Sequence, residues 1–72
     1  MKLVIKLREV LKEKGVTQMQ LAELADVRQA AISELCRNAR EEVNLAMITR
    51  IASALNITDI SILMQFEDET TN

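Results

Sequence analysis

Hydrophobic residues recur three and four positions apart along almost the whole chain, which is the spacing of one face of an α-helix. No alternation of apolar and polar residues runs long enough to indicate a strand. The chain has no proline and one glycine, Gly15. The pattern predicts five helices, over residues 2–14, 18–25, 28–37, 45–55 and 59–66. We therefore expect an all-α fold, with one compact five-helix domain at residues 1–66 and an acidic flexible tail at residues 67–72.

The apolar faces of the first four helices supply the expected core. The inward residues are Leu3, Leu7, Val10 and Leu11 in the first helix, Leu21, Ala22 and, at the margin, Leu24 in the second, Ile32 and Leu35 in the third, and Leu45, Ile48, Ile51, Ala52 and Leu55 in the fourth. About half of the residues, 49%, are hydrophobic, which is enough for one core in a chain of 72 residues.

Short polar residues mark the expected helix ends. Gly15 can take a positive φ after the first helix, and Thr17 with Gln20 has the spacing of a capping box for the second. Asp26 and Val27 form the corner before the third helix. The remaining caps are Asn44 and Thr58 at helix starts and Asn56 as a left-handed helix end.

Charge is divided unevenly between the two halves of the chain. The net charge is −2, which argues against a nucleic-acid partner. However, residues 1–40 hold eight basic and five acidic residues, and residues 41–72 hold one basic and six acidic residues. A partner rich in phosphates would therefore meet the first half, and the acidic end "EDETTN" would face away from it.

The stretch "TQMQLAELADVRQAAISEL", residues 17–35, resembles the helix-turn-helix of the phage repressor and Cro (XRE) family. The residues that carry the resemblance are Thr17-Gln18, Leu21-Ala22, Val27, Ile32-Ser33 and Leu35. Downstream, "NLAMITRIASALNI" resembles the fourth helix of the family and "TDISILM" the fifth, so the resemblance covers residues 5–64. In this family the third helix enters the major groove of DNA.

Three positions depart from the family pattern. Asp26 stands at the corner where glycine is usual, and it can take a positive φ at modest cost. Arg28 stands where the family often has Ser or Thr, so the third helix lacks a good cap and begins with a disfavoured cation. Leu11 and Cys36 occupy positions where many members pair an Arg with a Glu, and we interpret them as a coordinated apolar replacement.

The resemblance implies a set of DNA-contacting residues on and around the third helix. Gln29 is suited to adenine, Arg28 to guanine or phosphate, and Glu34 to a cytosine amino group. The expected base contacts are Arg28, Gln29, Ala30, Ser33 and Glu34. The expected phosphate contacts are Gln18, Arg37, Asn38 and Arg40. Each residue could instead be an ordinary solvated position on a helix or loop.

The helix expected at residues 59–66 is apolar around much of its circumference, which suggests a partner surface. We expect a homodimer, with Ile62, Met64 and Phe66 as candidate interface residues. The leading hypothesis is a sequence-specific transcription regulator that binds double-stranded DNA, with repression as its expected mode. The alternative is a protein-binding module on the same fold, such as an antitoxin or regulatory subunit, that acts through this fifth helix.

Other function classes receive little support. The chain has no histidine, and five small helices leave little room for a catalytic pocket, so we expect no enzyme. We expect no metal, no cofactor and no small-molecule ligand, and we interpret the single cysteine, Cys36, as a packed thiol. Without a signal peptide or membrane span, the expected location is the cytoplasm. The operator, target genes and inducing signal stay open.

Overall fold

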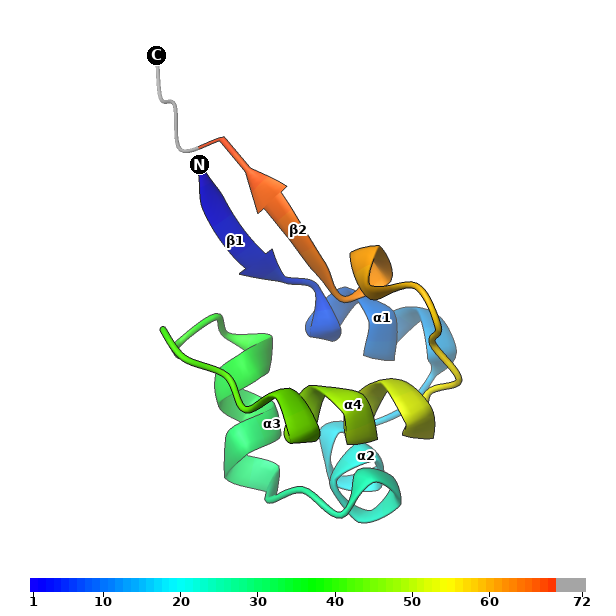
Figure 1. The fold of residues 1–72 in the computed structure, drawn as a ribbon. Helices are drawn as coiled ribbons and strands as arrows, with labels where there is room; N and C mark the ends of the chain where they lie inside the picture. The colour runs from blue at the N-terminus through cyan, green and yellow to red at the C-terminus, as the bar shows by residue number, and fades with distance from the viewer. Residues whose placement is uncertain (69–72) are drawn as a thin grey trace.

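The computed structural model describes residues 1–68, and four α-helices form its body (Figure 1). They are α1 (Leu7–Lys14), α2 (Gln18–Ala25), α3 (Gln29–Cys36) and α4 (Leu45–Ala54). A short 3₁₀ turn, η1 (Ile60–Ile62), and two strands, β1 (Lys2–Ile5) and β2 (Met64–Glu67), complete the described chain. The predicted helical class with a helix-turn-helix at α2 and α3 is confirmed, but the count of five helices is wrong.

The two ends of the described chain form an antiparallel ribbon that projects from the helical body (Figure 1). Lys2 lies opposite Glu67, and Ile5 lies opposite Met64. The first predicted helix therefore starts five residues too early, and the fifth is replaced by η1 and β2. Both strands have four residues, so their alternation was too short to stand out in the sequence. Glu67, predicted to belong to the flexible tail, lies in β2, and residues 69–72 lie outside the described residues.

One hydrophobic core joins all four helices and the residues that follow α4. The largest fully buried side chains are Leu7, Leu21, Ile32, Leu35, Ile51 and Leu63. Three expected core positions are wrong, because Leu3, Leu24 and Leu45 are 47%, 64% and 79% exposed. Leu3 is exposed because it lies on the projecting ribbon rather than on α1. The core of the helical body therefore contains fewer side chains than the apolar pattern of the sequence predicts.

The helix ends follow the sequence prediction closely. The Thr17 hydroxyl accepts a hydrogen bond from the Gln20 N–H (3.0 Å), and the Gln20 side chain accepts one from the Thr17 N–H (2.9 Å). The Asn44 Oδ1 caps α4 by accepting a hydrogen bond from the Met47 N–H at 3.2 Å. Gly15, Asp26 and Asn56 take the expected positive φ values. One cap is wrong: Asp59, not Thr58, caps η1, and hydrogen bonds from the Ser61 hydroxyl and N–H lower the Asp59 pKa.

The pair of residues that departs from the family pattern is buried in this core. Leu11 and Cys36 are each 4% exposed. Because both side chains are uncharged, neither buried position holds a charge that would need a partner. Burial raises the pKa of the Cys36 thiol, which keeps it in the neutral form near pH 7. No helix within residues 1–68 has the length and hydrophobicity that a membrane span requires.

Candidate nucleic-acid interface

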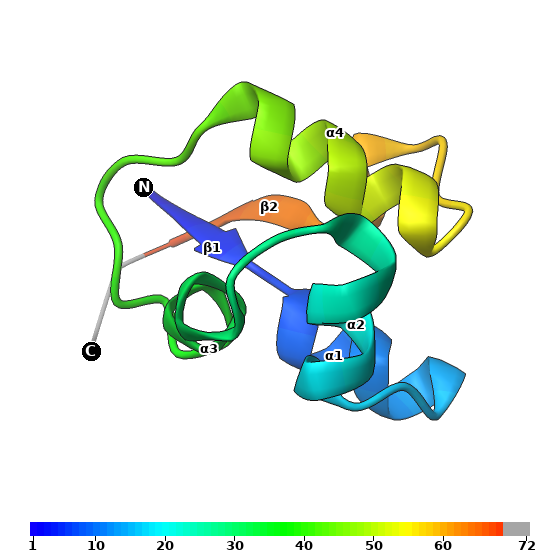
Figure 2. The same cartoon turned by 90° about the horizontal axis from the view of Figure 1, so that it is seen from below.

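The α2–α3 corner fixes the position of α3 against the rest of the domain. Asp26, at φ 55°, ends α2 with its N–H near the Ala22 and Glu23 carbonyls, and Val27 donates its N–H to the Ala22 carbonyl at 3.0 Å. Val27 is also buried, so the corner is held by packing as well as by backbone hydrogen bonds. Figure 2, seen from below, looks along α3 with α2 beside it. The corner thus sets the angle at which α3 leaves α2.

α3 has two clearly different faces. Ile32, Leu35 and Cys36 are buried and anchor the helix to the core. Gln29, Ser33 and Arg37 follow one another at intervals of four residues, so they form a line along the helix, beside the buried residues at Gln29 and turned outward at Arg37. Ala30 and Glu34 form a second line beside it. The residues predicted to contact bases are therefore gathered on the outward side of one rigidly anchored helix.

Exposure differs along this face. Arg28, Gln29, Ala30 and Arg37 are exposed, whereas Ser33 and Glu34 are partly buried. The small Ala30 side chain leaves the first turn of α3 uncrowded between Arg28 and Glu34. A flat first turn lets a helix approach the floor of a groove closely. The first turn of α3 is thus the part best able to reach a base edge.

The beginning of α3 carries no side-chain cap within the described residues. Arg28 occupies the N-cap position, and only its carbonyl accepts hydrogen bonds, from Ala31 and Ile32. The N–H groups of Gln29 and Ala30 are therefore available to an acceptor from outside, as expected for the first turn of a helix. The guanidinium of Arg28 adds positive charge at the same place. Together these groups favour an anionic partner here.

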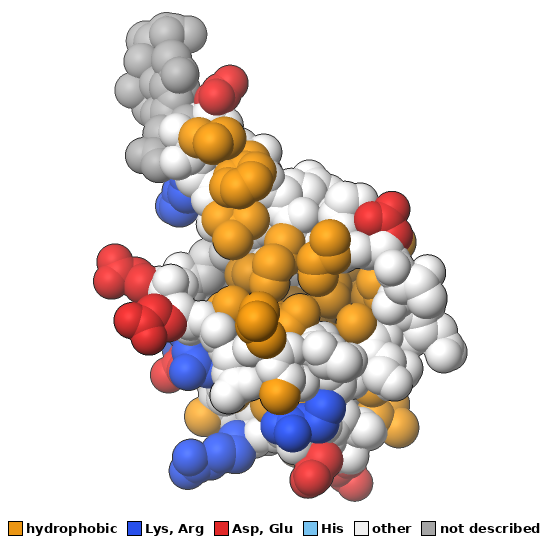
Figure 3. All heavy atoms as spheres, in the orientation of Figure 1, with side chains coloured by type: hydrophobic (Ala, Val, Ile, Leu, Met, Phe, Trp, Pro, Cys, Tyr) orange, Lys and Arg blue, Asp and Glu red, His pale blue; other side chains and the backbone are white. Residues whose placement is uncertain are grey.

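Gln18, the first residue of α2, is partly buried at a second helix start. Its neighbour Thr17 caps the Gln20 N–H, which leaves the N–H groups of Gln18 and Met19 outside the capping box. The start of α2 is therefore also suited to an anion. Figure 3 shows basic side chains, mixed with acidic ones, at the end of the body where Figure 1 places α2 and α3.

Two of the predicted contact residues bind each other. The Arg40 Nε lies 3.7 Å from the Glu34 Oε1, and the Arg40 Nη1 lies 4.0 Å from the Met47 sulfur. The pair is partly exposed, so it contributes little to stability. It does reduce the negative charge that Glu34 would otherwise present to DNA. Glu34 is thus held toward the α3–α4 loop by a cation rather than left free on the helix.

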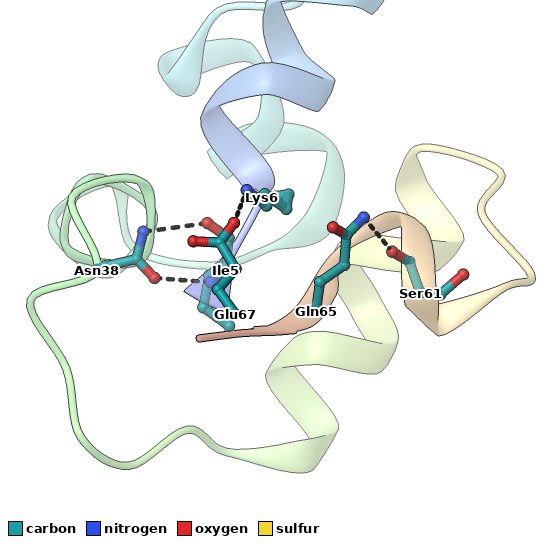
Figure 4. A network of polar contacts seen from close by, with 6 residues as sticks. All are labelled: Ile5, Lys6, Asn38, Ser61, Gln65 and Glu67. Carbon is teal, nitrogen blue, oxygen red and sulfur yellow. Dashed lines mark hydrogen bonds and ion pairs between the residues drawn. The ribbon is translucent and has the colours of Figure 1, made fainter. Parts of the chain in front are cut away.

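Asn38 has a structural partner that sequence reasoning missed. Its Oδ1 accepts a hydrogen bond from the Ile5 N–H at 2.7 Å, and its Nδ2 donates to the Ile5 carbonyl at 3.1 Å (Figure 4). Asn38 also takes a positive φ of 55° just after α3. The side chain therefore ties the end of α3 to β1. Only the preference of asparagine for left-handed positions could have hinted at this role.

The candidate dimer residues do not lie on a helix face. Ile62 is in η1, and Met64 and Phe66 are in β2. Met64 packs against the core, whereas Ile62 and Phe66 are 46% and 66% exposed. The apolar surface predicted for this segment therefore exists, but it belongs to the ribbon and the turn that precedes it.

Comparison with known proteins supports the geometry. The model of a helix-turn-helix family matches residues 7–63, which include all four α-helices and η1. A crystal structure of "a putative DNA-binding protein from Bacteroides fragilis" superposes with a TM-score of 0.75. It is 30% identical in sequence, and the alignment covers 89% of this chain and 100% of that chain. Among curated proteins, none matches the sequence.

Proposed function

The chain belongs to the helix-turn-helix family of the Cro/C1 (XRE) type, and on that premise we propose that it is a sequence-specific regulator of transcription. The protein binds double-stranded DNA and reads the major groove with α3. The observation that carries this proposal is the two-sided character of α3, whose buried residues fix it to the core while Gln29, Ala30 and Arg37 stay exposed.

The proposed contacts divide into base readers and phosphate contacts. Gln29 is the principal reader because its amide can both donate to and accept from adenine. Arg28 reads guanine or holds a phosphate, Ala30 contacts a thymine methyl group, and Ser33 adds a hydrogen bond. Glu34 contributes by excluding wrong bases. The phosphate contacts are Gln18, Arg37 and Arg40, and Asn38 is left out because its amide already binds Ile5.

Repression is the regulatory mode that we propose. A protein that occupies an operator excludes other proteins from it and needs no further surface to do so. The proposal includes a homodimer, because paired half-sites match a twofold protein, and no catalytic role. A DNA-binding regulator must reach the DNA, so we propose a cytoplasmic location.

The first test is selection of bound duplexes from a random pool at about 0.15 M salt, where non-specific contacts weaken. Recovery of a shared motif would support a sequence-specific binder. If correctly folded protein, checked by circular dichroism, enriches no sequence, the proposal is wrong for this chain. The selected motif would also supply a single half-site for the variants that follow.

Gln29→Ala separates base reading from general affinity. Measured on a single half-site, it should relax discrimination at one base pair by about 1–3 kcal/mol. Gln65→Ala is the matched control, because Gln65 lies on the ribbon and its loss should leave discrimination unchanged. Equal weakening on every sequence by Gln29→Ala would contradict its role as a reader.

Arg37→Ala tests the phosphate contacts. It should weaken binding to all sequences alike and lower the salt dependence by about one counterion. Lys12→Ala removes the same charge from the last turn of α1 and serves as the control. If both variants lowered the salt dependence equally, the effect would belong to overall charge and not to a phosphate contact.

A further inference from the structure

An acidic side chain, that of Glu34, lies on the outward face of α3 that is proposed to meet DNA. With about 3.6 residues per turn, Glu34 lies almost opposite the centre of the side that α3 buries. Its side chain is 46% exposed. A carboxylate that faces DNA is repelled by the phosphates and loses water on binding, so it needs a positive partner to remain there. The loop after α3 supplies that partner.

The end of α3 turns the chain so that Arg40 comes back beside Glu34. Asn38 takes a positive φ of 55°, and its N–H donates to the Leu35 carbonyl at 3.1 Å. The Ala39 N–H donates to the Glu34 carbonyl at 2.9 Å, which closes the helix end in the manner usual for a left-handed residue. The Asn38 side chain also binds the β1 backbone (Figure 4). The backbone is thus fixed up to the residue before Arg40.

The guanidinium of Arg40 contacts residues of both α3 and α4. Its Nε lies 3.7 Å from the Glu34 Oε1, which is longer than a hydrogen bond, and its Nη1 lies 4.0 Å from the Met47 sulfur. Met47 itself packs against the core. The Arg40 side chain is 33% exposed, so water still reaches it. A guanidinium has five N–H donors in a planar fork, and these two contacts leave donors free for another anion.

Acidic side chains surround the open side of Arg40. A hollow of about 400 Å³ is lined by Glu34, Ala39, Arg40, Glu41 and Glu42. Glu41 and Glu42 are exposed and follow Arg40 directly in the loop, whereas Glu34 stands on the helix. Of these three carboxylates, only that of Glu34 lies within ion-pair distance of the Arg40 guanidinium in the described part of the chain. The contact therefore selects the one acidic residue of the hollow that belongs to α3.

We propose that Arg40 is a positioning residue for Glu34 and is shared between Glu34 and a DNA phosphate. In the free protein, Arg40 holds the Glu34 carboxylate toward the loop. On DNA, the free donors of the guanidinium bind a phosphate while its contact with the carboxylate keeps Glu34 in place on α3. Glu34 can then accept a hydrogen bond from a cytosine amino group and reject bases that present only acceptors there. Arg40 therefore affects which sequence is bound as well as how tightly DNA is bound.

This assignment rests on the proposed DNA-binding function and gives Arg40 a role beyond a phosphate contact. A phosphate contact alone orients the protein and carries no sequence information. Without Arg40, however, the Glu34 carboxylate would turn toward water, because the phosphates repel it. The two roles therefore differ in one measurable quantity, which is the discrimination among bases at the base pair that Glu34 faces.

The test uses the full chain and the half-site recovered by selection from a random pool. Each position of that half-site is replaced in turn by the other base pairs, and binding is measured by fluorescence anisotropy. Glu34→Ala identifies the base pair that Glu34 reads, where discrimination should fall by about three- to tenfold. Arg40→Ala should weaken binding to every sequence. It should also lower discrimination by a similar factor, at that base pair only.

Matched variants separate positioning from overall charge. Arg37→Ala removes a cation from the same end of α3, and Arg37 forms no ion pair within residues 1–68, so all sequences should weaken equally. Glu41→Ala removes a carboxylate beside Arg40 and should strengthen binding to all sequences equally. In the double variant Glu34→Ala/Arg40→Ala, discrimination should equal that of Glu34→Ala alone, because Arg40 acts on the base pair only through Glu34.

Three results would overturn the positioning role while the proposed DNA binding stands. They are an Arg40→Ala variant that weakens every sequence equally, a Glu34→Ala variant that changes discrimination at no base pair, and a loss of discrimination by Arg40→Ala that is the same with and without Glu34. A folded chain that selects no sequence has no reader to position, so in that case both proposals fail. Circular dichroism of each variant establishes that its helices are folded.

Discussion

α3 and the β1–β2 ribbon are both amphipathic, but they expose opposite chemistry. α3 buries Ile32 and Leu35 and shows water a polar line of side chains. The ribbon pairs a polar face with an apolar one and leaves Leu3 and Phe66 47% and 66% exposed. A hydrated polar face is stable alone and can exchange water for DNA. An exposed apolar face gains free energy only by burial against another apolar surface.

The two regions are joined at one residue. Asn38 ends the α3 segment and binds the β1 backbone at Ile5. The orientation of α3 relative to the ribbon therefore depends on two hydrogen bonds as well as on the core. Substitutions in the two regions should therefore differ in how much they lower the free energy of unfolding and in whether they also change DNA binding.

The largest effect on stability is expected from a substitution on the buried side of α3. Ile32→Ala should lower the free energy of unfolding by about 2–5 kcal/mol, because it opens a cavity at a position with 0% exposure. Leu24→Ala, at an exposed apolar position, should cost no more than about 0.5 kcal/mol. Urea denaturation followed by circular dichroism measures both. Comparable losses would mean that the core is not organised around α3.

The connection between the regions should give the next largest effect. Asn38→Gly keeps the positive φ accessible but removes both hydrogen bonds to Ile5, so we expect a loss of about 1–2 kcal/mol. Asn56→Gly is the control, because Asn56 is the other asparagine with a positive φ. Its side chain makes no hydrogen bond within residues 1–68, so this substitution changes only the preference of the backbone. Equal losses in urea denaturation would show that the amide of Asn38 contributes nothing.

A smaller effect is expected at the start of α3, where one substitution should raise the stability of the domain and weaken DNA binding. Arg28→Ser supplies the missing N-cap and should stabilise the domain by up to about 1 kcal/mol while it weakens DNA binding. Arg37→Ser removes a charge from the other end of α3 and should weaken binding with no gain in stability. Thermal unfolding and titration with the selected half-site check the two quantities. A variant Arg28→Ser that is stabilised and binds DNA undiminished would remove Arg28 from the interface.

The smallest expected effect concerns the ribbon's ion pair. The carboxylate of Glu67 accepts a hydrogen bond from Lys6 and raises the Lys6 pKa above its ordinary value of 10.5. Its stabilisation is therefore complete below pH 10.5 and is lost as the pH rises through the raised pKa. Glu67→Gln should lower the melting temperature slightly at neutral pH and not at all above the Lys6 pKa. Added salt should shrink the difference, and a difference that persists at high pH would rule out the ion pair as its cause.

By itself the sequence determined the helical body and the place of the helix-turn-helix at α2 and α3. Apolar spacing of three and four, with caps at Thr17, Gly15, Asp26 and Asn44, acts within a few residues and so can be seen locally. The outward face of α3 follows from the same spacing, since burial of Ile32 and Leu35 leaves Gln29 and Arg37 outside. These features are local, and the tertiary structure only confirms them.

The tertiary structure alone decided what happens at the two ends of the chain. Residues 2–5 and 64–67 form strands because they pair with each other, and Lys2 and Glu67 are too far apart in sequence for periodicity to register the pairing. A four-residue strand has too little alternation of its own, and tertiary hydrogen bonds override its local preference. The same kind of long-range contact gives Asn38, for which the sequence predicts a phosphate contact, two hydrogen bonds to the Ile5 backbone. Local physics thus specified the helices, and contacts across the whole chain specified the ribbon.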